Sequence, residues 1–113
     1  MGWYTAAKNY SGMLRWAYNS WTAFPTRDAR FRTWPAGDCY FIYPESSSVR
    51  FQRLIEGIQD FEKIRILREK WAAEGLKEKI AALDSALSAF NIDSLGVNGP
   101  MPALAAGRAA IAE

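Results

Sequence analysis

Residues 48–75 read SVRFQRLIEGIQDFEKIRILREKWAAEG, and the spacing of the apolar side chains in this stretch predicts a long helix. The apolar side chains recur at helical intervals: Phe51, Leu54, Ile55, Ile58, Phe61, Ile64, Leu67 and Trp71. Charged side chains fill the opposite face, which is the pattern of an amphipathic helix. The run of serines at 46–48 offers an N-cap, and Gly75 suits a C-cap. Gly57 costs roughly 1 kcal/mol against alanine inside a helix, so we expect a neighbouring element to approach closely there.

Two short segments ahead of this helix have the length and composition of strands. Residues 13–18 and 39–43 are rich in apolar and aromatic side chains, and Pro44 stops the second segment. Residues 20–38 read as a long loop, long enough for the crossover that parallel strands require. We therefore predict an α+β fold in which two short parallel strands are covered by the long helix and by one or two further C-terminal helices.

The remaining elements are also expected to be helical. Residues 3–10 predict a short helix, and apolar residues at steps of four and three predict another over 76–90. Residues 93–100 are rich in glycine and asparagine and read as a linker. An alanine-rich stretch at 102–112 predicts a last helix.

The distribution of rings and charges divides a single domain into three segments. Residues 1–44 hold 12 of the 16 aromatic side chains and form an aromatic strand-loop-strand segment. Residues 45–91 carry eight basic and eight acidic groups and form a helical segment. Residues 92–113 form a linker and a short C-terminal helix.

Several kinds of chemistry are excluded by composition. The chain has one cysteine, Cys39, and no histidine, so an internal disulfide, the usual zinc sites and histidine-based nucleophilic machinery cannot form. No two acidic residues are adjacent anywhere. We therefore expect no catalytic residue, no metal site and no cofactor in this chain.

The charge pattern also bears on partners. A net charge of +2 gives little attraction to nucleic acid or to an anionic membrane, and we expect neither as a partner. Residues 27–34, RDARFRTW, interleave arginines with rings as single-strand binders do, but the near-neutral chain weakens that alternative. No apolar run has transmembrane length, and residues 1–12 lack the layout of a signal peptide. The localisation is left open, with an extracytoplasmic parent protein as one alternative.

The rings near the two strand ends define a candidate sugar site. Alternation along a strand puts Trp16 and Tyr18 on one face. Large flat rings beside an amide suit sugars, because a pyranose presents apolar C–H faces and a rim of hydroxyls; packing of the rings in the core is an equally consistent alternative. The candidate substrate-binding residues are Trp16, Tyr18, Asn19, Trp21, Tyr43 and, as a hydrogen-bond acceptor, Asp38.

Three motifs resemble a known family. GMLRWAYNSW at 12–21, AGDCYFIYP at 36–44 and SSVRFQRLIEGIQDFEKI at 47–64 resemble the C-terminal part of the domain of unknown function 4091, which is similar to the glycoside hydrolase family 123 catalytic domain. The resemblance covers about residues 3–72. In the helix, the R-x-x-R-L-x-x-G-I-x-D pattern falls on Arg50, Arg53, Leu54, Gly57, Ile58 and Asp60.

The resemblance implies the last part of a (β/α)8 barrel, with the two predicted strands as its seventh and eighth. It also implies hydrolysis of N-acetyl-β-galactosaminides, in which an adjacent Asp-Glu pair orients the acetamido group and protonates the leaving oxygen. Because that pair is missing here, we expect a module that contributes sugar-site walls, is inactive alone, and meets carbohydrate together with the rest of its barrel. Self-association of the isolated chain is a further expectation, and a small helical protein-interaction module is the alternative.

Overall fold

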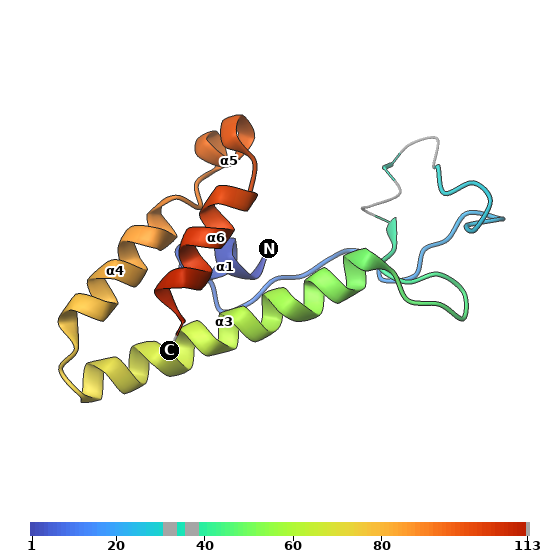
Figure 1. The fold of residues 1–113 in the computed structure, drawn as a ribbon. Coiled ribbons are helices and arrows are strands. Elements are labelled where there is room, and N and C mark those ends of the chain that lie inside the picture. The colour runs from blue at the N-terminus through green and yellow to red at the C-terminus, as the bar shows by residue number, and fades with distance from the viewer. Residues whose placement is uncertain (31–33, 36–38, 113) are drawn as a thin grey trace. The chain divides into compact units, whose positions relative to one another are not determined.

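The computed structural model describes residues 1–30, 34–35 and 39–112, and most of them are helical (Figure 1). The helices are α1 (Gly2–Ala7), α3 (Val49–Ala73), α4 (Lys77–Ser88), α5 (Ile92–Asn98) and α6 (Met101–Ala110). The chain groups into two compact units: a helical unit, Met1–Met13 with Gly57–Glu113, and an aromatic unit, Leu14–Glu56. This grouping by contacts does not test the predicted division into three sequence segments, which stays a prediction.

The predicted α+β fold with two parallel strands is wrong. Over the described residues there is no sheet, and the only strand-like pairings are two isolated antiparallel bridges, Asn19 with Tyr40 and Tyr43 with Ser46. β-Propensity becomes a strand only where neighbouring strands supply hydrogen bonds and packing, and two segments alone are marginal. The ring-rich segments 13–18 and 39–43 therefore do not form strands, and the bridge that connects these two stretches of chain is that of Asn19 with Tyr40.

The long helix is confirmed. Ser48 caps α3, because its Oγ accepts a hydrogen bond from the backbone N–H of Phe51 at 3.1 Å. At the other end, Gly75 follows α3 with φ of 70°, the left-handed conformation that ends many helices, and its N–H donates to the carbonyl of Ala72 at 3.3 Å. The helix thus begins and ends where its sequence signals place it.

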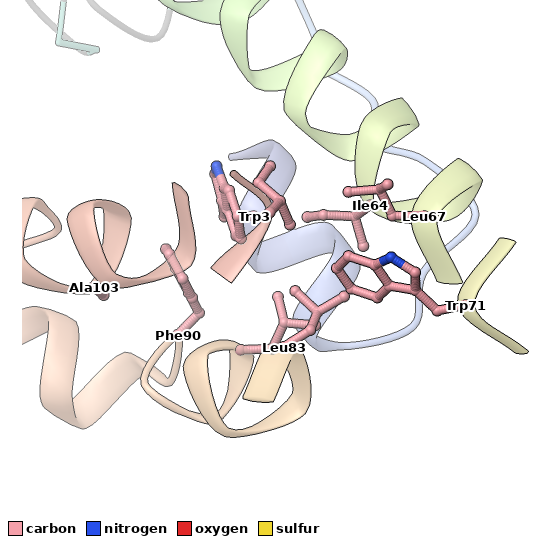
Figure 2. Packing of buried hydrophobic residues seen from close by; sticks show 9 residues of the cluster. Trp3, Ile64, Leu67, Trp71, Leu83, Phe90 and Ala103 are labelled. Carbon is pink, nitrogen blue, oxygen red and sulfur yellow. The ribbon is translucent and has the colours of Figure 1, made fainter. Parts of the chain in front are cut away.

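The apolar stripe of α3 packs differently from the expectation. Its buried members Ile64, Leu67 and Trp71 belong to the helical unit and contact other helices, whereas the sequence predicted that the stripe would cover two strands. Figure 2 shows these side chains facing the residues of the other helices. The buried cluster comprises Trp3, Ile64, Leu67, Trp71, Leu83, Leu87, Phe90, Ala103 and Ile111. α4 contacts both α1 and α6, and α5 contacts α6, which completes the helical unit (Figure 1).

Gly57 lies where α1 meets α3, as the sequence predicted for a close approach. A Cβ at Gly57 would lie 3.4 Å from the backbone nitrogen of Gly2, and one at Gly2 would lie 1.9 Å from the carbonyl oxygen of Gly57. The two backbones therefore touch directly, and the tighter requirement for glycine is at position 2.

Asp60 joins three helices of the same unit. Its Oδ2 accepts a hydrogen bond from the indole Nε1 of Trp3 at 2.8 Å and from the guanidinium of Arg108 at 3.1 Å. The Trp3 ring is stacked on Phe90 with centroids 5.4 Å apart. One carboxylate thus holds α1 and α6 against α3.

One helix was missed by the sequence prediction. Residues 92–98, read as part of a linker, form α5, and Asn91 caps it by accepting a hydrogen bond from the N–H of Ser94 at 2.8 Å. None of the helices over the described residues is long and apolar enough to cross a membrane.

Candidate functional site

The predicted sugar-site residues that the structure describes all lie in the aromatic unit. Trp16, Tyr18 and Trp21 expose 62%, 47% and 38% of their surfaces, so this chain does not bury them in a core. Asn19 is also exposed, whereas Tyr43 is partly buried. Asp38 lies outside the described residues.

Two backbone hydrogen bonds bring the ring-bearing segments together. The N–H of Phe41 donates to the carbonyl of Tyr18 at 2.8 Å, and the N–H of Ser20 donates to the carbonyl of Cys39 at 3.1 Å. The indole Nε1 of Trp21 adds a hydrogen bond to the carbonyl of Ile42 at 2.8 Å. Residues 18–21 are therefore held beside residues 39–42, while Trp16 precedes the paired stretch.

A tight turn sets the position of Tyr43. Tyr43 and Ser46 exchange backbone hydrogen bonds of 2.9 and 3.2 Å around Pro44 and Glu45. Glu45 has φ of 57°, which matches the third position of a turn with proline at its second position. The turn makes Tyr43 the last residue of its segment, although that segment is not the strand that the sequence predicted.

Arg50, in the first turn of α3, anchors the second segment, although it was not among the predicted site residues. Its guanidinium lies over the Tyr40 ring at 5.2 Å and over the Tyr43 ring at 6.0 Å, and its Nε donates to the carbonyl of Tyr40 at 3.3 Å. The two tyrosine rings meet edge to face with centroids 5.3 Å apart. Burial raises the pKa of the Tyr40 hydroxyl above its ordinary value and Tyr43 adds to this, while Arg50 acts in the opposite direction.

Ser48 connects the same segment to the start of α3. Its hydroxyl donates to the carbonyl of Phe41 while its oxygen accepts from the N–H of Phe51. The ring of Phe51 in turn meets Tyr18 edge to face at 5.9 Å. The helix start therefore fixes both segments that carry the predicted wall residues.

A hollow of about 380 Å³ lies beside Tyr43, and both apolar and polar groups line it. Its lining residues are Pro25, Thr26, Arg27, Ala29, Tyr43 and Ser46. The loop that forms one side turns at Phe24, whose carbonyl accepts from the N–H groups of Arg27 and Asp28 at 3.0 and 2.9 Å. A ring, hydroxyls and one cation can hold a polar ligand with an apolar face, but they supply no pair of carboxylates for acid and base catalysis. Over the described residues, no group of three or more metal-ligating side chains comes together.

A comparison with protein families assigns the chain to a family. The model described as "Glycoside hydrolase 123, catalytic domain" matches residues 1–67, which is more than half of the chain. The molecule is thus a glycoside-hydrolase-like module. The chain belongs to the glycoside hydrolase 123 catalytic domain family. No curated protein shows a significant match, and the likeness to the domain of unknown function 4091 stays a prediction.

Proposed function

We propose that the aromatic unit forms part of the carbohydrate-binding wall of a glycoside-hydrolase-like protein that acts on N-acetylhexosaminides. The observation that carries the proposal is the exposure of Trp16, Tyr18 and Trp21 on segments tied together by hydrogen bonds. Exposed rings are costly in water unless something covers them, and a sugar ring with its C–H faces is a fitting partner. Membership of a glycoside hydrolase family supports the choice of a sugar over other flat ligands.

We further propose that the chain does not hydrolyse glycosides by itself. A glycosidase that uses the substrate acetamido group needs one carboxylate to orient that group and another to protonate the leaving oxygen. No adjacent pair of acids occurs in the sequence. In the aromatic unit, Asp28 is held by Arg30, whose Nε and Nη2 each lie 2.8 Å from a carboxylate oxygen. The catalytic carboxylates would then come from another part of the protein.

The binding proposal is tested by titrating N-acetylgalactosamine into the full chain while recording the indole N–H signals by NMR. We expect Trp16→Ala to weaken binding roughly three- to tenfold, because a lost ring contact is worth on the order of 1 kcal/mol. Trp34→Ala is the matched control, because Trp34 is similarly exposed at 57% but was not assigned to the site. Equal weakening by both variants, or no shift at high millimolar sugar, would contradict the proposed wall.

The catalytic part is tested with a chromogenic N-acetyl-β-galactosaminide. We expect no release of the chromophore above the buffer rate at any pH between about 4 and 8, the range in which carboxylate pairs operate. Release that saturates with substrate and disappears in heat-denatured protein would refute the proposed inactivity.

A protein-interaction module remains the second candidate, and one observation favours it. Ile92, Val97 and Met101 in α5 and α6 are 72%, 84% and 68% exposed, although helices of this size normally cover such side chains. Sedimentation of the full chain over a range of concentrations distinguishes the candidates. Self-association that is abolished by Val97→Ser but not by Trp16→Ala would favour the interaction module.

A further inference from the structure

The hollow beside Tyr43 contains a positive charge and no lining carboxylate. Arg27 provides a guanidinium, and Thr26, Tyr43 and Ser46 provide hydroxyl groups. Such a lining differs from the carboxylate-rich sites that bind neutral sugars through their hydroxyls. It is suited to a ligand that carries negative charge.

The charge of Arg27 is not neutralised by the acid next to it. Asp28 is engaged by Arg30 through its side chain and through a backbone N–H at 3.0 Å. That contact lowers the pKa of Asp28 from 3.8 to about 2, so the carboxylate stays ionised and committed to Arg30. Within the described part of the chain, Arg27 makes no ion pair.

A second guanidinium lies near the ring of Tyr43, one of the residues that line the hollow. Arg50 is 6.0 Å from the centroid of the Tyr43 ring and is itself held by the Tyr40 carbonyl. The faces of the Tyr40 and Tyr43 rings attract the Arg50 cation, and this attraction in turn helps to fix the plane of the Tyr43 ring. Tyr43 is therefore a positioned stacking surface with positive potential on the side of Arg50.

We propose that this hollow is a subsite for the charged group of an anionic sugar, with Arg27 binding the sulfate or carboxylate and Tyr43 stacking on the ring. The inference rests on the proposed function and narrows its substrate class to sulfated or carboxylated sugars. A guanidinium fork matches two oxygens of either group, and the hydroxyls of Thr26 and Ser46 can donate to a third. Arg50 acts as a positioning residue for Tyr43.

The test compares four ligands by NMR titration of the full chain: N-acetylgalactosamine, its 6-sulfate, glucuronic acid and sodium sulfate. We expect at least one anionic sugar to bind three- to tenfold more tightly than the neutral sugar, as a partly exposed charge-assisted contact allows. The sulfated and carboxylated arms identify which group is preferred. Arg27→Met should remove this advantage, because it should lower the affinity for the anionic sugar more than the affinity for the neutral sugar.

Two further variants separate charge from structure. Arg27→Lys should keep part of the preference, because it retains the charge but loses the planar fork. Arg53→Met is the matched control, since Arg53 is an exposed arginine of the same unit that pairs with Glu56 instead. It should leave every affinity unchanged.

The outcomes distinguish the subsite from the sugar site as a whole. Equal affinity for neutral and anionic sugars would overturn the subsite and leave the proposed function standing. Binding of sodium sulfate as tight as that of the sulfated sugar would overturn the subsite as well, because the sugar ring would then contribute nothing. Failure of all four ligands would overturn both proposals.

Discussion

At the scale of single residues, Gly2 and Gly57 contact each other but differ in the space that each leaves for a side chain. A methyl group at position 2 would lie 1.9 Å from a carbonyl oxygen, whereas one at position 57 would meet only ordinary contacts at 3.4 Å. We expect Gly2→Ala to lower the free energy of unfolding by about 1–3 kcal/mol through overpacking. We expect Gly57→Ala to be neutral or to stabilise by up to roughly 1 kcal/mol, because alanine favours the helix. Urea denaturation followed by circular dichroism measures both, and a larger loss at position 57 would refute this description of the contact.

Asp28 offers a second test at the same scale. Its pKa is lowered from 3.8 to about 2, first by the side-chain hydrogen bond with Arg30 and then by the backbone N–H of Arg30. Because the folded pKa lies below the ordinary value, the contact is complete above pH 3.8 and is lost as the pH falls through about 2.

We expect Arg30→Gln to raise the pKa of Asp28 most of the way back to its ordinary value, since only the backbone donor would remain. Carbon-13 NMR titration of the carboxyl group measures this pKa directly. Arg53→Gln serves as the control and should leave the titration of Asp28 unchanged. An unshifted Asp28 in the unmodified chain would show that its contact with Arg30 does not persist in solution.

At the scale of elements, the start of α3 depends on Ser48, which also binds the segment that carries Tyr43. Ser48→Ala removes both the helix cap and the bond to the Phe41 carbonyl, so we expect a loss of roughly 0.5–2 kcal/mol. Ser47→Ala is the control, because the Ser47 hydroxyl accepts only from the exposed Gln52 side chain. Amide exchange in the first turn of α3 should rise in the Ser48 variant and not in the Ser47 variant. No change in either would mean that the cap does not hold the helix start.

The elements differ in how well their own sequences predict them. The helix over 48–74 was predictable because its period, cap and terminal glycine are local and agree with one another. The strands were predicted from β-propensity alone, and that property depends on neighbours that the pattern of one segment does not contain. α5 was missed because Gly96 and the Gly99-Pro100 pair suggested a linker, although Asn91 is a typical N-cap residue and Asp93 follows in the first turn.

For the candidate site, the rings were visible in the sequence but their supports were not. Exposed Trp16 and Trp21 could be picked out because large aromatics in a loop-rich segment are unusual. Arg27 and Arg50 could not be picked out in the same way. Arg27 lies in a loop and Arg50 in the first turn of α3, and only the folded chain brings both near Tyr43. The available signal for Arg50 was its place as the first residue of the R-x-x-R-L-x-x-G-I-x-D pattern.

At the scale of the whole molecule, the two units differ in how much apolar surface they bury. The helical unit contains the nine-residue core cluster, whereas Cys39, Tyr40 and Phe41 are the buried hydrophobic residues among those that the structure describes in the aromatic unit. We expect the aromatic unit to open more readily, so the amides of Ser20 and Phe41 should exchange at least tenfold faster than those of Leu67 and Leu83. Native-state hydrogen exchange measures the difference. Equal protection of all four amides would mean that the chain opens as one cooperative unit.

The core cluster has a practical consequence for choosing protein boundaries. The family match stops at residue 67, yet six of the nine clustered side chains come later in the chain: Trp71, Leu83, Leu87, Phe90, Ala103 and Ile111. A protein shortened to the matched region would therefore lose the side chains that cover Trp3, Ile64 and Leu67. The apolar surface exposed in this way would promote aggregation. Boundaries set by the family match alone would therefore remove most of the side chains on which the helical unit packs.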